Sequence, residues 1–285
     1  MGETAIAGLD HSIIGVRDLE AARSAYERLG FTVTGRGRHR GWGTANYCIM
    51  FGPDYLELLG IIDPEQFNAG LEDFLKEREG LMRIACRSDD IEATRAHLQA
   101  DGFNPGELQD LGRFLEMPEG DVVPRFKLSH LPAADTPGLA TFFCQHLTPE
   151  MVWRPEWMTH ANGAQAVYAY TILHQNPAAL AACYERFFGI TPVVQDSRII
   201  VETGGGKLVF CRPEDLQQLH PGLIWSGPED DGTMIAATIS VAETDRTASV
   251  LDQNGVSYAR GADGALLVAP ADACGMAIRF QAIYR

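Results

Sequence analysis

The sequence predicts an α+β protein in which four β-α-β-β-β modules pair into two domains, residues 1–148 and 164–285, with a connector at 149–163. Two observations lead to this prediction. The same strand and helix pattern recurs four times, and each predicted helix ends at or near a glycine. A chain of 285 residues with 46% hydrophobic content is also long and apolar enough for two ordinary domains.

The repeat is clearest around the four predicted helices. The segment "DLEAARSAYERLGF", from Asp18, matches "NPAALAACYERFFGI", from Asn176, with the letters YER in register. The segment "DDIEATRAHLQADGF", from Asp90, matches the first copy at its Gly-Phe pair, and "VAETDRTASVLDQNGVSY" is a weaker fourth copy. A recurring supersecondary unit of this length indicates duplicated modules.

Each module starts with an apolar strand: "HSIIGV", "LMRIACR", "AVYAYTIL" and "MIAATISV" in turn. A polar residue then begins the helix: Asp18, Asp90, Asn176 or Glu243. Further strands are expected at "FTVTGRG", "TANYCIMF" and "YLELLGI" in the first module, and at "ITPVVQ", "RIIVE" and "KLVFC" in the third. Since one module leaves a sheet face bare, two modules are expected to curve around a shared cleft.

Composition excludes several classes of partner. The net charge is -15 with a pI near 4.9, which argues against nucleic acid and anionic membranes. The six cysteines are scattered without a CxxC pair, as expected of buried thiols in a reducing cytoplasm. We see neither a signal peptide nor an apolar run long enough to span a membrane. A small-molecule ligand is therefore expected.

Paired modules, with "LDHSIIGVRDLEAA" opening the first and "YLEL" on its last strand, resemble the vicinal oxygen chelate superfamily. The segments "RHRGWGTANYCIMFGPDYLELLG", "FFCQH" and "HANGA" resemble its glyoxalase-like group in particular. The superfamily includes glyoxalase I, extradiol dioxygenases, methylmalonyl-CoA epimerase and antibiotic-resistance binders. The resemblance implies the fold more strongly than any one reaction, because this fold hosts several chemistries.

The resemblance implies a divalent metal, such as Zn, Mn, Fe, Co or Ni, in the cleft of the first domain. Its ligands would be His11 on the first strand and Glu57 on the fourth, with His146 as a third. Taken alone, a histidine in an apolar strand is usually a core residue. Glu57 is harder to explain that way, because a buried carboxylate without a partner is costly.

Other residues are candidates for binding substrate. Arg83 stands where the second module repeats His11, and a guanidinium there suits a carboxylate or phosphate. Gln145 and His146 share the last strand of the first domain, and alternation lets only one of them face the cleft. His160 and Asn162 in "THANGA" are further candidates, although capping of a turn explains them equally well.

The loop "RGRHRGWGTAN" is a basic patch in an acidic protein and suits an anionic ligand. It supplies His39, which we expect to act with Glu57 in catalysis, and the substrate-binding candidates Arg38, Trp42 and Asn46. A solvated hairpin tip is the simpler reading of the same letters. The glycines of the loop permit a tight turn near a ligand.

The second domain lacks these residues, because Ala169, Val209 and Ala236 stand where His11, Glu57 and Arg83 stand in the first. We expect it to be structural, to cover the cleft or to form a homodimer contact. The sequence therefore predicts a metal-assisted lyase or isomerase that acts on a small oxygenated anion through an enolate-like intermediate. The alternatives are a resistance-type binder without catalysis and a protein with a dead cleft. An extradiol dioxygenase is disfavoured, because those enzymes keep their metal ligands in the second domain.

Overall fold

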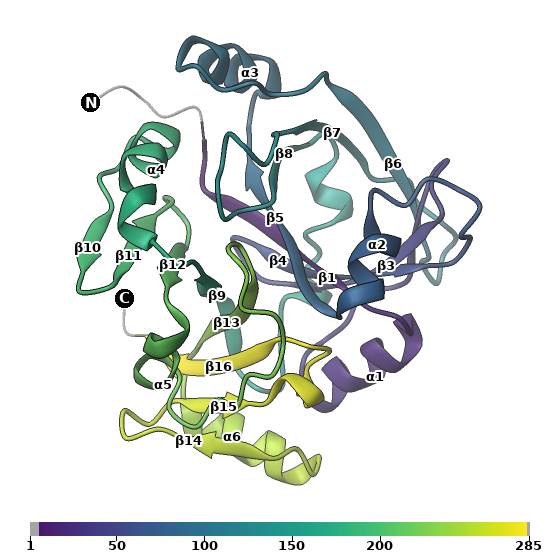
Figure 1. The fold of residues 1–285 in the computed structure, drawn as a ribbon. Coiled ribbons are helices and arrows are strands. Elements are labelled where there is room, and N and C mark those ends of the chain that lie inside the picture. Colours follow the sequence, from purple (N-terminus) through teal and green to yellow (C-terminus); the bar gives the residue numbers. More distant parts are fainter. Residues whose placement is uncertain (1–5, 284–285) are drawn as a thin grey trace.

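The computed structural model describes residues 6–283 and contains two eight-stranded sheets lying side by side (Figure 1). The first sheet, drawn in purple to teal, closes into a barrel with the strand order β1-β4-β3-β2-β6-β7-β8-β5. Its strands are β1 (Leu9–Gly15), β2 (Gly37–His39), β3 (Thr44–Met50), β4 (Tyr55–Ile61), β5 (Gly80–Arg87), β6 (Gln109–Leu115), β7 (Arg125–His130) and β8 (Thr141–His146).

The second sheet, drawn in green to yellow, stays open and has the order β10-β11-β12-β9-β13-β16-β15-β14. Its strands are β9 (Ala164–Leu173), β10 (Val193–Gln195), β11 (Arg198–Glu202), β12 (Lys207–Cys211), β13 (Met234–Val241), β14 (Tyr258–Arg260), β15 (Leu266–Val268) and β16 (Ala277–Ala282). The two sheets confirm the prediction of an α+β fold built from paired modules.

The helices lie outside the sheets, and the four residues expected to begin them all stand at helix starts, with Asn176 opening a 3-10 turn that leads into its helix. Asp18 and Asp90 each accept two backbone N–H bonds at the helix start, whereas Asn176 and Glu243 make no such cap. The helices are α1 (Leu19–Arg28), α2 (Leu71–Glu77), α3 (Ile91–Ala100), α4 (Ala181–Phe188), α5 (Leu216–Leu219) and α6 (Thr244–Gln253), with short 3-10 turns η1 (Pro149–Met151), η2 (Pro155–Trp157), η3 (Pro177–Leu180), η4 (Pro213–Asp215) and η5 (Pro270–Asp272).

The barrel closes because β2 pairs with strands of both modules. Gly37 and Arg38 pair with β3 on one side, and all three residues of β2 pair with β6 on the other. On the opposite side of the barrel, β1 pairs with β5. Side chains of alternate residues on every strand therefore point into one enclosed interior.

A single apolar cluster joins the two sheets. It contains aromatic side chains from both halves, such as Phe31 against Phe280 and Phe143 against Phe187. The backbone N–H of Val167 in the second sheet also donates to the Asp54 carboxylate of the first, at 3.0 Å. The barrel is thus held against the second sheet by a shared core.

The predicted first-module strand "FTVTGRG" is wrong over most of its length, since only Gly37 lies in a strand. Residue Thr32 instead meets the connector, where its N–H donates to Nδ1 of His160 at 3.0 Å, and the Thr34 N–H makes an isolated bond to the Cys48 carbonyl of β3. The Thr32 hydroxyl also donates to the Thr159 carbonyl at 2.6 Å. The Thr32 N–H, satisfied by His160, does not need a neighbouring strand. Within the described part of the chain, no helix combines the length and apolarity needed to cross a membrane.

Candidate functional site

The barrel interior holds a cavity of about 60 Å³. Its walls are mostly apolar and aromatic, and its polar lining residues are His11, His39, Glu57, Arg83, Arg113 and His130. An apolar cavity with a few convergent polar groups is typical of a small-molecule site.

Glu57 and His11 meet at one side of this cavity. The strands β1 and β4 run parallel, with Ile13 opposite Glu57. His11 is two residues before Ile13, so its side chain lies on the same inner face of β1. The Nε2 atom of His11 lies 3.5 Å from Oε2 of Glu57. Asn46 fixes the other carboxylate oxygen, because its Nδ2 donates to Oε1 of Glu57 at 2.5 Å.

Burial alone would raise the pKa of the Glu57 carboxyl. The charges of His11, His39 and Arg113 and the Asn46 hydrogen bond outweigh burial, and they hold this pKa below its ordinary value. Glu57 is therefore an anion at neutral pH, although the residue is 95% buried. A carboxylate kept ionised inside an apolar cavity is suited to bind a cation or to accept a proton.

His39 approaches Glu57 from β2. Its Nδ1 lies 2.8 Å from the Thr44 hydroxyl, and its Nε2 lies 3.7 Å from Oε1 of Glu57. Burial lowers the pKa of His39 to about 4, so its imidazole is neutral at pH 7. A neutral imidazole held through one nitrogen can offer the other as a ligand atom or a proton acceptor.

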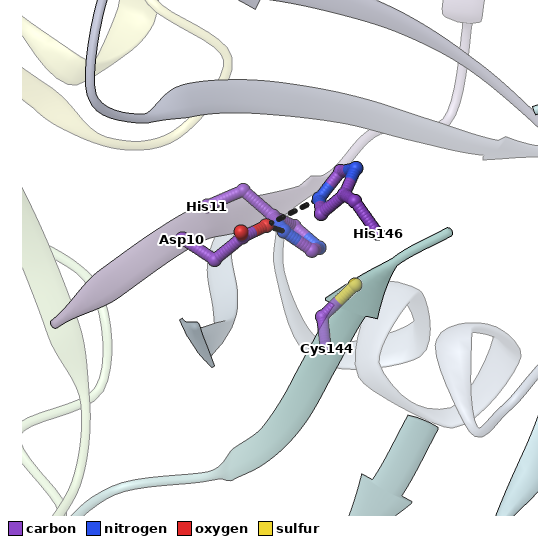
Figure 2. A group of neighbouring side chains, drawn as sticks. All are labelled: Asp10, His11, Cys144 and His146. Carbon is purple, nitrogen blue, oxygen red and sulfur yellow. Dashed lines mark hydrogen bonds and ion pairs between the residues drawn. The ribbon is translucent and has the colours of Figure 1, made fainter. Parts of the chain in front are cut away.

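Asp10 lies behind His11 and is fully buried. Simple alternation along β1 would put Asp10 and His11 on opposite faces, but the pairing with β5 shifts register between Leu9 and His11. The Asp10 carboxylate therefore turns toward the histidine, and Oδ1 lies 2.5 Å from Nδ1 of His11 (Figure 2). Sequence reasoning missed Asp10, and its only signal was a carboxylate inside the apolar letters "LDHSII".

His146, at the end of β8, contacts the same carboxylate. Its Nε2 lies 3.0 Å from Oδ1 of Asp10, and its buried Nδ1 has no partner among the described residues. Burial works to raise the pKa of Asp10, but the charge and hydrogen bonds of His146 and His11 hold it well below its ordinary value. His146 is not itself among the lining residues, and its imidazole is linked to His11 through Asp10.

Four donor side chains gather here and form one candidate metal cluster (Figure 2). One ligand atom from each lies within 4.8 Å of the others: Asp10, His11, Cys144 and His146. Burial raises the pKa of the Cys144 thiol well above its ordinary value, so this sulfur is protonated without an ion. His11 belongs both to this cluster and to the group around Glu57.

Two arginines line the cavity. Arg83 was predicted from the sequence, whereas Arg113 of β6 was missed. Arg113 is buried, donates to the Cys48 sulfur at 3.2 Å and lies over the ring of Phe126. The alternation of β6, with Leu111 and Leu115 on the same side as Arg113, is the signal that could have found it.

The loop that supplies His39 divides between inside and outside. Trp42 lines the cavity and stacks edge-on against Phe67, with ring centroids 5.0 Å apart. Arg38 points out of the barrel, where it approaches Asp121 at 3.5 Å and Glu116 at 3.9 Å. The loop therefore brings His39 and Trp42 to the site, and Asn46 through Glu57, but not Arg38.

Three further predicted residues lie outside the cavity lining. Gln145 bonds the start of α3, accepting from the Ile91 N–H and donating to the Asp89 carbonyl. His160 bridges Thr32 and the Met50 carbonyl. Asn162 holds the turn before β9, donating to the Leu29 carbonyl and accepting from the Ala164 N–H. In this structure all three bond the backbone of neighbouring segments.

The sequence matches the model of the glyoxalase-like domain family over residues 9–188, from β1 to the end of α4. The match covers more than half of the chain. The chain belongs to the glyoxalase-like domain family. Comparison of its sequence with curated proteins found no match.

Several solved structures share the fold of this glyoxalase-like protein. A hypothetical protein from Staphylococcus aureus is similar, with a TM-score of 0.68 and 14% identity over 96% of this chain and 99% of that one. A mutant of 4-hydroxymandelate synthase from Streptomyces coelicolor has a TM-score of 0.61 and 11% identity over 99% and 95%. A xylose isomerase-like TIM barrel/4-hydroxyphenylpyruvate dioxygenase fusion protein has a TM-score of 0.60 and 15% identity. The match covers 100% of this chain and 50% of that one. At such identities these likenesses show the fold.

Strand register identifies the equivalent positions in the two modules of this glyoxalase-like barrel. Ile13 lies opposite Glu57 on β4, and Ala85 lies opposite Phe142 on β8. His11 and Arg83 are then equivalent, since His11 pairs with Ala85 and Ile13 pairs with Arg83. The first module thus supplies a histidine and a carboxylate, where the second supplies a guanidinium and a phenyl ring.

The second sheet carries no donor at the matching positions. Thr171 of β9 takes the place that Ile13 has in the barrel. Its register partner on β12 is Val209, where Ile13 has Glu57. Its partner on β13 is Ala236, where Ile13 has Arg83. An apolar cluster formed by α5, Leu223 and their neighbours packs on this sheet. The metal-type donors of the glyoxalase-like fold are therefore confined, at these positions, to the barrel.

Proposed function

We propose that the chain is a metal-assisted lyase or isomerase of the vicinal oxygen chelate superfamily, acting on a small oxygenated anion. The observation that supports this most is that His11 and Glu57 converge in one cavity of the barrel, with Nε2 and Oε2 3.5 Å apart. An ionised carboxylate and an imidazole from neighbouring strands are ligands that suit zinc, manganese, iron, cobalt or nickel.

The donor groups present fit such an ion. The atoms that would bind the ion are Nε2 of His11 and Oε2 of Glu57. The other polar atom of each side chain already has a partner: Nδ1 of His11 contacts Asp10, and Oε1 of Glu57 accepts from Asn46. Outer partners of this kind orient metal ligands and keep an imidazole in the required tautomer. A divalent ion bound by His11 and Glu57 would supply a Lewis acid that stabilises negative charge on two adjacent substrate oxygens.

The other cavity residues have separate roles in this proposal. His39, neutral at pH 7 and 3.7 Å from Glu57, would accept a proton from a substrate carbon next to a carbonyl group. In an isomerase the same nitrogen would return that proton to the neighbouring carbon. The apolar walls exclude water, and the cationic Arg83 attracts the anionic part of the substrate.

A protein that binds a small molecule without catalysis is the second candidate. The observation in its favour is that Arg83 and Phe142, at the positions equivalent to His11 and Glu57, cannot complete a metal site. In this alternative the cavity would hold its ligand through Arg83 and its aromatic walls. It would bind no stoichiometric metal.

Metal analysis of the purified full-length protein separates the two candidates. We expect about one divalent ion per chain, lost in both His11→Ala and Glu57→Gln and kept in His97→Ala, an exposed histidine on α3. His146→Ala tests whether the third ligand comes from the cluster behind His11. Wild-type protein that stays metal-free after incubation with each of the five ions would overturn the enzyme proposal, and unchanged metal in both cavity variants would overturn the ligand assignment.

A further inference from the structure

Arg83 is a charged side chain of the cavity that the structure leaves without a partner. The guanidinium is half-buried, and no described residue gives it a hydrogen bond or an ion pair within 4.0 Å. Burial lowers the pKa of Arg83, yet an arginine remains a cation at neutral pH. A partly buried, unpaired guanidinium is costly unless a ligand compensates its charge.

His130 of β7 lines the same cavity as Arg83, from the second strand along the sheet, and has no role assigned from the sequence. Its ring stacks on Phe142, with centroids 5.1 Å apart and an interplanar angle of 28°. Burial and then the charge of Arg83 lower the pKa of His130, so the imidazole is neutral at pH 7. Its ring nitrogens have no recorded partner among the described residues, and a neutral imidazole offers one N–H donor.

The two arginines of the cavity differ in their partners. Arg113 donates to the Cys48 sulfur at 3.2 Å and lies near enough to Glu57 for the two charges to interact. Among the described residues, no such donor–acceptor contact is found for the Arg83 guanidinium. Arg83 is therefore the arginine of this cavity that is open to an anionic ligand.

Strand register fixes how far Arg83 lies from the chelating side. Glu57, Ile13 and Arg83 are successive register partners on β4, β1 and β5. Neighbouring strands are about 4.8 Å apart, so the Cα atoms of Glu57 and Arg83 are separated by roughly 10 Å. The apolar side chain of Ile13 lies between them and lines the cavity.

We propose that Arg83 and His130 form a carboxylate subsite, and that the ligand of this cavity is a small monocarboxylate with an apolar segment. The carboxylate would accept two parallel N–H bonds from the Arg83 fork and one from the His130 ring. This inference rests on the proposed function for the identity of the reacting end, which would lie near His11 and Glu57. A phosphate dianion is disfavoured, because one guanidinium leaves its second charge uncompensated among apolar walls.

Binding of butyrate, of the neutral analogue butyramide and of inorganic phosphate to the full-length protein tests the subsite. Affinities are measured by ligand-observed NMR at constant ionic strength, with and without prior chelator treatment. We expect butyrate to bind at least tenfold more tightly than either of the other two. Arg83→Met should weaken butyrate at least tenfold, Arg83→Lys less, and His130→Phe about threefold, because the fork supplies more of the bonding than the ring.

Arg260→Met is the matched control, since Arg260 is exposed on β14 and pairs with Asp245 at 3.0 Å. Its butyrate affinity should equal that of the wild type. Thermal unfolding of each variant shows whether it is folded, and Arg83→Lys retains the charge if Arg83→Met does not fold. Equal binding of butyrate and butyramide, tighter binding of phosphate, or full affinity in Arg83→Met would overturn the subsite. Arg83-dependent binding in chelator-treated protein supports the subsite even where metal analysis rejects the enzyme proposal.

Discussion

Oδ1 of Asp10 lies 3.0 Å from Nε2 of His146, although 136 positions separate the two residues in the sequence. The contact joins the first strand of the barrel to the last. The same oxygen also lies 2.5 Å from Nδ1 of His11. One buried carboxylate therefore contacts both the cavity histidine His11 and the second histidine, His146. This arrangement leads to the first of four predictions.

Asp10→Ala should lower the free energy of unfolding by about 3 kcal/mol, because it leaves two buried imidazoles without their acceptor. Asp10→Asn keeps one acceptor and should cost about 1 to 2 kcal/mol. The folded pKa of Asp10 lies below its unfolded value, so its contribution is present above about pH 4 and is lost as pH falls further. Urea unfolding at several pH values measures this. A constant gap between wild type and Asp10→Asn from pH 7 to pH 3 would contradict it, and the exposed variant Asp110→Asn is the control.

Asn46 holds Oε1 of Glu57 at 2.5 Å and is the outer partner of the proposed ligand. Asn46→Ala should weaken divalent-metal affinity about 10- to 100-fold, because outer partners of metal ligands typically have effects of that size. Competition with a chelating dye measures the dissociation constant. Asn104→Ala, whose side chain contacts Asp135 on the surface, should leave that constant unchanged.

Phe142 occupies the position equivalent to Glu57, and the ring faces His11 edge-on at 5.5 Å between centroids. Phe142→Glu should tighten metal affinity by tenfold or more, because it adds a second carboxylate at the site. Leu128→Glu, from another strand of the cavity wall, is the matched comparison. If both variants change metal affinity equally, the positional argument fails and only added charge matters.

His220 should make the second half of the molecule sensitive to acid. Its Nε2 lies 2.8 Å from the Thr171 hydroxyl, and burial, helped by the charge of Arg279, lowers its pKa to about 4. The unfolded chain therefore binds a proton near pH 6.5, where the folded chain does not, so stability is full above about pH 6.5 and falls toward pH 4. The loss should reach about 3 kcal/mol, since each pKa unit is worth about 1.4 kcal/mol. His220→Gln should make this part of the urea-unfolding profile shallower, with the remaining slope due to His39, whose pKa is also about 4. An unchanged slope would contradict the assignment.

Local patterns predicted most of the strands. "YLELLGI", "RIIVE" and "KLVFC" coincide with β4, β11 and β12, because each is a short apolar run with polar neighbours. The strand predicted at 31–37 failed before Gly37, since Thr32 bonds the connector, which lies far along the chain, and Thr34 makes only an isolated bond to β3. A contact of that kind leaves no trace in the local pattern.

The site was predictable only in part for a similar reason. His11, Glu57, His39, Trp42 and Arg83 all reach the cavity lining, and Asn46 reaches it through Glu57. Asp10 was missed because a bulge overrides alternation. Arg113 and His130 were missed because β6 and β7 become cavity walls only when the barrel closes. Whether the predicted residues act as assigned stays a prediction that the variants above test.

Closure of the barrel by β2 also determines how a ligand must travel. An open cup can admit a molecule across a sheet edge, but a continuous ring of paired strands has no such gap. Passage therefore runs along the barrel axis, past residues of the connecting loops such as Trp42 and Ala69, which line the cavity. Selection by size would then depend on loop residues that can change without disturbing a single strand pair, while the chemistry inside stays constant.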